Sequence, residues 1–361
     1  MTTINIINDK FTINGQPTYA GRTCEGLPVE GLLFNVRAVQ ATFDYANPGT
    51  RGLWAYPDTG VWDPERNVTE FMAALPQWRD HGVLGFTVNF HGGGCRYIPE
   101  VYDTYLNSGF TPEGEIVPAY ADRISRVLAR ADELGMVVIV GMFYWKQTLK
   151  MHGEAAVWRA VENALSFLKG TGRQNVLIEI ANESDIHFGM DIFTLENAHR
   201  MLDHFKNLYP EFMISTSYVV GYQMKHGKEL TADFIRACDF IMPHGNGLTP
   251  EQLGPGLDAV KNHPAYGAAP KPILINEDST GIPNLEASWR RYVSWGYYDQ
   301  GFNGEQRVHD RWVEPPYPPR EDRIAALTGF QTPPVNWTIN TPRKRAFFDR
   351  VAEITGAGAG R

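Results

Sequence analysis

Short apolar runs alternate with amphipathic segments along most of this 361-residue chain. The apolar runs predict strands near residues 36–43, 84–90, 136–143, 175–182, 212–218, 238–243, 272–277 and 293–298. Apolar residues at helical spacing predict helices over 64–80, 120–134, 155–168, 195–208 and 341–355. Alternating strands and helices indicate a parallel sheet. About eight such pairs favour an α/β fold of the closed (β/α)8, or TIM, barrel type.

The N-terminal segment and the loops complete this picture. Residues 3–20 alternate around Asn14-Gly15, a strong β-hairpin signal, and such a hairpin can plug the bottom of a barrel. No break in composition divides the chain, so we expect one catalytic domain over residues 1–361, with a frayed tail at 356–361. Long polar and aromatic loops, which build the active site on the top face of a barrel, are expected at 44–63, 91–119, 144–153 and 299–336.

Charge and composition indicate which classes of partner and which cellular location to expect. The net charge of −8 argues against a nucleic-acid partner. The sequence contains no run of 18 apolar residues, so it predicts no membrane span. The N-terminus does not resemble a signal peptide, and three widely spaced cysteines argue against a disulfide framework, so we expect a cytoplasmic protein. The oligomeric state stays open.

Two acidic residues at the ends of predicted strands carry most of the chemical information. Glu183 ends the run Val176-Leu-Ile-Glu-Ile-Ala-Asn-Glu183, and Glu277 ends Pro272-Ile-Leu-Ile-Asn-Glu277. They lie 94 residues apart, which is about three βα units of roughly 30 residues each. On a closed barrel the two carboxylates would face each other across the mouth. Cleavage of a glycosidic bond needs a facing pair of this kind.

A third acidic residue, Glu179, shares one strand face with Glu183 and should point into the barrel one layer below it. A buried carboxylate needs a cation or hydrogen-bond donors. Arg37, on the first predicted strand, is the candidate partner. We expect Glu179 to be structural support.

The segment Glu179-Ile-Ala-Asn182-Glu183 resembles the strand-4 signature of retaining glycoside hydrolases of clan A, in particular the cellulase-like family 5. Lys271-Pro-Ile-Leu-Ile-Asn-Glu277 is similar to strand 7 of that clan. The resemblance implies a barrel glycosidase with Glu183 as acid/base, Glu277 as nucleophile and Asn182 as ligand of the sugar 2-hydroxyl. It also implies a β-linked substrate. Trp295 or Tyr298 resembles the strand-8 aromatic beneath the sugar.

The resemblance runs as a pattern from about residue 30 to 350 and is specific only at strands 4 and 7. Ser184 replaces a proline after the acid/base. Strand 2 lacks the expected arginine, which Arg37 would supply from strand 1. His244-Gly-Asn246 on strand 6 lacks a tyrosine, and Asn276-Glu277-Asp278 replaces the common Gly-Glu-Phe/Tyr. These departures leave the family and the sugar open.

The predicted site combines the two glutamates with polar and aromatic residues at strand ends. Substrate-binding candidates are Arg37, Asn89, His91, Tyr144, Asn182, His244, Trp295 and Tyr298. We predict a retaining glycosidase acting by double displacement on a small oligosaccharide or glycoside, without a metal or other cofactor. A metal-dependent barrel hydrolase using His91, His187 or His244 is one alternative, although no H-E-x-x-H or C-x-x-C motif is present. A non-catalytic sugar-binding barrel is the other.

Overall fold

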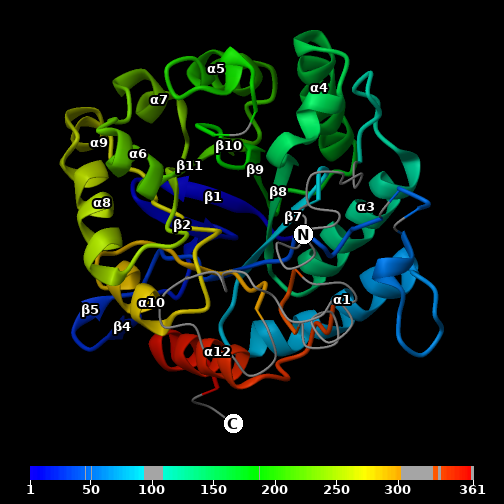
Figure 1. The fold of residues 1–361 in the computed structure, drawn as a ribbon. Helices are drawn as coiled ribbons and strands as arrows, with labels where there is room; N and C mark the ends of the chain where they lie inside the picture. Colours follow the sequence, from blue (N-terminus) through cyan, green and yellow to red (C-terminus); the bar gives the residue numbers. More distant parts are fainter. Residues whose placement is uncertain are drawn as a thin grey trace.

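A ring of parallel strands lies at the centre of the molecule, and helices surround it (Figure 1). The fold is seen in a computed structural model that describes residues 1–44, 46–49, 51–92, 109–186, 188–301, 328–331 and 335–358. One parallel sheet has the order β10-β9-β8-β7-β6-β13. Its strands are β6 (Asn35–Arg37), β7 (Gly85–Asn89), β8 (Val137–Phe143), β9 (Val176–Ala181), β10 (Met213–Ser215) and β13 (Gly296–Tyr297).

Short strands and single bridges complete the ring between β10 and β13. β11 (Ser217–Val219) follows β10 and pairs in parallel with β12 (Met242–His244). Parallel bridges then join Ile241 to Ile273 and Leu274 to Ser294. These connections give the (β/α)8 barrel predicted from the sequence. The strands are shorter than expected, and the segment 272–277 pairs only through bridges.

The helices predicted from apolar spacing are all present around the barrel. The described helices are α1 (Pro64–Asp80), α3 (Pro118–Glu133), α4 (Glu154–Gly170), α5 (Ala198–Leu208), α6 (Val220–His226), α7 (Ala232–Ala237), α8 (Pro250–Asn262), α9 (Pro264–Ala268), α10 (Ile282–Trp289) and α12 (Pro342–Thr355), with short 3₁₀ helices at Arg51–Trp54, Trp145–Lys150 and Asp191–Phe193. α1 shows why the bounds were readable. The Asp63 side chain accepts from the Glu65 and Arg66 amides, both at 2.9 Å, and Pro64 occupies the first turn, where its missing N–H costs nothing.

The N-terminal hairpin plugs the barrel, as its sequence predicted. β1 (Ile4–Ile7) and β2 (Lys10–Ile13) pair antiparallel, and β3 (Gln16–Pro17) joins β2 after a turn in which Asn14 and Gly15 have φ angles of 54° and 76°. Figure 1 shows β1 and β2 across the ring. Ile4 and Phe11 belong to one apolar cluster with the lower inward-facing barrel residues Leu33, Leu84, Val137, Ile139, Leu177, Phe240, Met242 and Leu274.

A larger apolar cluster lies between the strands and the helices. The short hairpin of β4 (Thr23–Cys24) and β5 (Leu27–Pro28) lies outside the ring, in contact with α12. No helix in the described part of the chain is long and apolar enough to span a membrane. Much of the predicted loops 91–119 and 299–336, and residues 359–361 of the predicted frayed tail, lie outside the described residues.

The plug should contribute strongly to stability. Phe11 is fully buried, and its ring meets Phe240 edge-on at 6.1 Å between centroids. Phe11→Ala is expected to lower the free energy of unfolding by about 3–5 kcal/mol, because it leaves a cavity at the barrel bottom. Urea denaturation measures the change. Ile7→Ala, at a 55 % exposed position of β1, is the control and should cost less than about 0.5 kcal/mol. Equal losses would show that the hairpin does not seal the barrel.

Candidate active site

Glu183 and Glu277 face each other at the carboxyl ends of their strands. Glu183 lies two residues after the end of β9. Glu277 ends the segment 272–277, which pairs with Ile241 and Ser294 through single bridges. One carboxylate oxygen from each glutamate and one ring nitrogen of His244 lie within 4.8 Å of one another. Glu183 is 7 % exposed and Glu277 3 % exposed. Two buried carboxylates therefore share one small space, as their spacing along the chain predicted.

Arg37 holds one of these carboxylates. Its Nε lies 2.7 Å from Glu277 Oε2, and its Nη2 donates to Asn182 Oδ1 at 2.6 Å. The guanidinium carbon lies 5.5 Å from the centre of the Tyr144 ring and 5.9 Å from that of Tyr298. Arg37 is fully buried. The arginine missing from strand 2 is thus supplied by β6. The direct ion pair of Arg37 is with Glu277, whereas toward Glu179, the partner proposed from the sequence, Arg37 has only a longer-range charge interaction.

The Glu179 carboxylate instead accepts hydrogen bonds from two neutral side chains, and one of these side chains also orients His244. Ser217 Oγ donates to Glu179 Oε1 at 2.5 Å, and Asn276 Nδ2 donates to Oε2 at 2.9 Å. Because the Asn276 NH₂ group faces a carboxylate, its Oδ1 accepts from His244 Nε2 at 2.8 Å. Neutral His244 then turns the lone pair of Nδ1 toward Glu183 Oε1, 3.2 Å away. That contact is a hydrogen bond when a proton lies between the two groups.

Burial and neighbouring charges distinguish the two glutamates. Burial raises the pKa of Glu183 to about 7; Arg37 opposes the rise and the charge of Glu179 adds to it. Burial also lowers the pKa of His244, so the proton between them belongs on Glu183. The pKa of Glu277 is raised by burial as well, but there Arg37 is in direct contact with the carboxylate and opposes the rise. The arrangement favours a protonated Glu183 beside an ionised Glu277.

The backbone at Glu183 is held in an uncommon conformation. Its φ angle is 54°, in the left-handed region that non-glycine residues rarely adopt. Ser217 stabilises this turn: its Oγ accepts from the Glu183 amide at 2.8 Å, and its carbonyl accepts from the Ser184 amide at 2.9 Å. Such conformations persist only where the surroundings enforce them, and they cluster at functional sites. Here the strained turn aims the Glu183 carboxyl group at Glu277.

Four other predicted binding residues are all buried: Tyr144, Tyr298, Asn89 and His91. Tyr144 and Tyr298 flank Arg37. Asn89 lies on the inner face of the barrel and packs closely against Gly141, because a Cβ added to this glycine would lie 2.5 Å from Asn89 Oδ1. His91 lies among aromatic rings, with centroids 5.5 Å from Phe110 and 5.4 Å from Phe143. Burial lowers the pKa of His91 to about 3, so this imidazole is neutral.

Trp295 does not occupy the predicted position beneath a sugar. Its indole is fully buried in the layer between the barrel and α12, where Nε1 donates to Asp278 Oδ2 at 2.6 Å and the ring centre lies 5.8 Å from that of Phe347. Successive strand residues point to opposite faces, so a shift of one position sends a side chain outward. Of the two strand-8 aromatics, Tyr298 is therefore the one near the site.

Sequence reasoning missed Asn246 as a site residue. Its amide Nδ2 donates to Glu183 Oε1 at 3.0 Å and to Glu277 Oε1 at 2.7 Å. The available signal was its place two residues after His244, on a strand-6 segment that lacks the tyrosine the resemblance led us to expect. Ser217 and Asn276 were also missed as site residues. Asn276 directly precedes Glu277, and this position was its only signal.

Glu183, His244 and Glu277 also form the kind of cluster that could hold a metal ion. The charge balance of the cluster argues against this use. Arg37 already places a cation 2.7 Å from Glu277, and Asn246 directs its N–H groups at both carboxylates. A metal ion would have to displace both. Of the other histidines considered, His91 lies among aromatic rings, and His187 lies outside the described residues.

No protein-family model and no curated protein matches this sequence, but solved structures share its fold. A glycoside hydrolase family 5 mannosidase from Rhizomucor miehei superposes with a TM-score of 0.52 at 13 % identity, covering 100 % of this chain and 99 % of that one. A variant of that mannosidase in complex with mannosyl-fructose gives 0.52 at 14 %, covering 99 % and 98 %. The β-mannanase of the blue mussel Mytilus edulis gives 0.50 at 10 %, covering 82 % and 90 %. This chain therefore shares the barrel fold of these solved structures.

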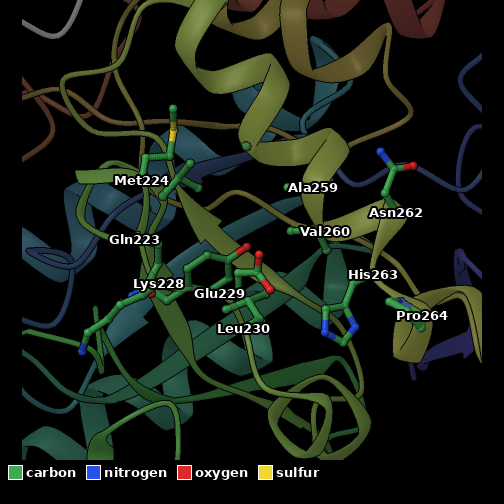
Figure 2. A pocket seen from close by; sticks show the side chains of 13 residues that line it. Gln223, Met224, Lys228, Glu229, Leu230, Ala259, Val260, Asn262, His263 and Pro264 are labelled. Atoms are coloured by element: carbon green, nitrogen blue, oxygen red, sulfur yellow. The ribbon is translucent and has the colours of Figure 1, made fainter. Parts of the chain in front are cut away.

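In the helix layer of this barrel, a separate cavity of about 290 Å³ lies between α6 and α8 (Figure 2). Gln223, Met224, Val260 and His263 are among its lining residues, and its walls are mainly apolar. The cavity belongs to the helix layer and does not include the two glutamates. Gln223 is the link between the two regions, because its Nε2 donates to Asp185, two residues beyond Glu183.

The buried Glu183 should make stability depend on pH. Its folded-state pKa of about 7 lies above the ordinary 4.5, so its contribution is fully present below pH 4.5 and is lost as pH rises through 7. The loss is about 3 kcal/mol. Glu183→Gln should therefore gain about 3 kcal/mol relative to the unsubstituted protein between pH 4.5 and pH 8 in urea unfolding. Glu133→Gln, on the exposed surface of α3, controls for loss of one negative charge. A gain independent of pH would contradict the raised pKa.

Proposed function

We propose that this protein is a retaining glycoside hydrolase that cleaves a β-linked glycosidic bond by double displacement. The observation that carries the proposal is the facing pair Glu183 and Glu277, with carboxylate oxygens within 4.8 Å. Retaining enzymes place their two carboxyl groups roughly 5–5.5 Å apart, whereas inverting enzymes leave about 6.5–9.5 Å for a water molecule. This proximity supports the retaining route.

In the first step Glu277 attacks the anomeric carbon of the sugar. A bond forms between its carboxylate oxygen and that carbon, while the bond to the leaving oxygen breaks. Glu183 transfers its proton to the leaving oxygen, so that an alcohol departs. Arg37 supports this division of roles because it keeps a positive charge beside Glu277 at 2.7 Å. His244, neutral at neutral pH, faces Glu183 without competing for its proton.

In the second step water replaces Glu277. Glu183, now a carboxylate, takes a proton from the water as the water oxygen bonds to the anomeric carbon, and the bond to Glu277 breaks. The two inversions together retain the anomeric configuration. Asn182 also fits this reaction cycle. Because Arg37 donates to its Oδ1, the NH₂ group of Asn182 is oriented to donate to a sugar hydroxyl next to the reacting carbon.

We propose a small oligosaccharide or glycoside as the substrate, with β-mannosides as the first class to test. Support for mannose comes from the solved structures with this fold, which include a mannosidase and a β-mannanase. One of them holds mannosyl-fructose, a small saccharide. Aryl β-mannosides, β-glucosides and β-galactosides compared side by side would separate the sugars. Binding without turnover of any of them would favour a sugar-binding barrel, and activity abolished by chelation would favour a metal-dependent hydrolase.

The two glutamates should fail differently when replaced. Glu277→Ala removes the nucleophile, so turnover of every substrate should vanish. Glu183→Ala should lose about 10²–10⁴-fold on substrates with poor leaving groups, while a dinitrophenyl glycoside still forms the covalent intermediate. Added azide should restore turnover of Glu183→Ala with a glycosyl azide of retained configuration. With Glu277→Ala it should give the inverted product. The azide products are identified by NMR, and identical products from both variants would overturn the assignment.

The rate should also depend on pH through Glu183. Because burial raises its pKa to about 7, kcat/KM for a substrate that needs protonation should fall as pH rises through 7 and the acid loses its proton. A dinitrophenyl glycoside needs little protonation, so the glycosylation step should lack this alkaline limb. Burst kinetics at a series of pH values measure that step. The same alkaline limb for both leaving groups would mean that another group controls the rate.

A further inference from the structure

A single neutral amide connects the two carboxylates of the site. Asn246 Nδ2 donates to Glu183 Oε1 at 3.0 Å and to Glu277 Oε1 at 2.7 Å. A primary amide has only two N–H bonds, so both are used. These bonds diverge from one nitrogen, and each fixes the direction in which one carboxylate lies. Arg37 holds the other oxygen of Glu277, so both oxygens of Glu277 are fixed.

The loop that carries Asn246 is held against the strand that carries Glu277. The Gly245 amide donates to the Glu277 carbonyl at 3.3 Å, and the Leu248 amide donates to the Gly245 carbonyl at 2.9 Å. Gly245 allows this close approach, because a Cβ there would lie 2.6 Å from Asp278 Oδ1. The short turn leaves Asn246 little freedom to move away from the two glutamates.

We propose that Asn246 is a positioning residue that holds the carboxyl groups of Glu183 and Glu277 at the separation that double displacement requires. The inference rests on the proposed function. An amide suits this place because it does not titrate and can donate in every state of the cycle. It donates to ionised Glu277 in the free enzyme and to the ester oxygen of the same residue in the covalent intermediate.

The charges around the pair explain why the donor is neutral. Within the described part of the chain, the charged or titratable groups that interact with the two glutamates are Arg37 on β6, His244 on β12, Glu179 on β9 and Asp185 beyond it. A second cation at position 246 would favour the ionised forms of both glutamates and so remove the acid. A carboxylate there would oppose ionisation of the nucleophile. The amide contacts both groups without either effect.

The test compares Asn246→Ala and Asn246→Ser with Asn175→Ala. The Asn175 amide donates to the Leu128 and Met136 carbonyls, away from the two glutamates, so its loss reports a merely structural effect. Asn246→Ala should lower kcat about 10- to 100-fold. It should also move both limbs of the kcat/KM pH profile to higher pH, because each ionised carboxylate loses a donor. Asn246→Ser, which keeps one donor, should recover part of both changes and serves if the alanine variant does not fold.

A second measurement separates this inference from the proposed function. Carboxyl titration by ¹³C NMR needs no substrate, and Glu183→Gln and Glu277→Gln assign the two signals. Loss of the Asn246 amide should raise the pKa of both carboxyl groups, whereas Asn175→Ala should leave them unchanged. If the protein turns over glycosides but neither the titrations nor the pH profile respond to Asn246, the inference is overturned and the function stands. If the titrations respond but no glycoside is cleaved, the function fails and the contact is upheld.

Discussion

The buried ion pair between Arg37 and Glu277 is the interaction on which the rest of the site depends. Its atoms lie 2.7 Å apart with almost no exposure of either side chain. Removing two charges from water costs several kcal/mol per ion, so neither would be stable there alone. The pair requires β6 and the segment before Glu277 to keep their register across the barrel. It also identifies which of two similar carboxyl groups has a cation beside it.

Around that pair the barrel interior changes from apolar to polar along its axis. At the bottom, Phe11 of the hairpin and the lower strand residues exclude water. Above them, Glu179 is satisfied by Ser217 and Asn276 and not by a second cation. Because these partners are neutral, the negative charge of Glu179 raises the pKa of Glu183. The same hydrogen bonds turn the free Nδ1 of His244 toward Glu183. Glu179, whose contacts are those of a structural residue, therefore also influences which group in the layer above carries a proton.

Much of the site could be anticipated because strand ends carry positional information. Glu183 and Glu277 each close an apolar run, and parallel strands of a barrel bring such ends to one face. Arg37, Asn182 and His244 follow the same rule, and all three lie at the pair. Trp295 shows where the rule fails. Near β13 an error of one residue exchanges the inner and outer faces, and the apolar pattern of a strand buried on both sides does not reveal which face is which.

The sequence by itself determined the barrel, its N-terminal hairpin, the presence of five of its helices with the bounds of α1, and the two facing glutamates, because these depend on periodicity, capping and turn chemistry within short segments. Only the tertiary structure decided which partners each carboxylate has. Asn246 and Ser217 reach the site from loops and strands far apart in sequence, and a hydrogen bond depends on an approach of about 3 Å that no local pattern encodes. The strained φ angle of Glu183 belongs with these features, because the neighbouring strand enforces it.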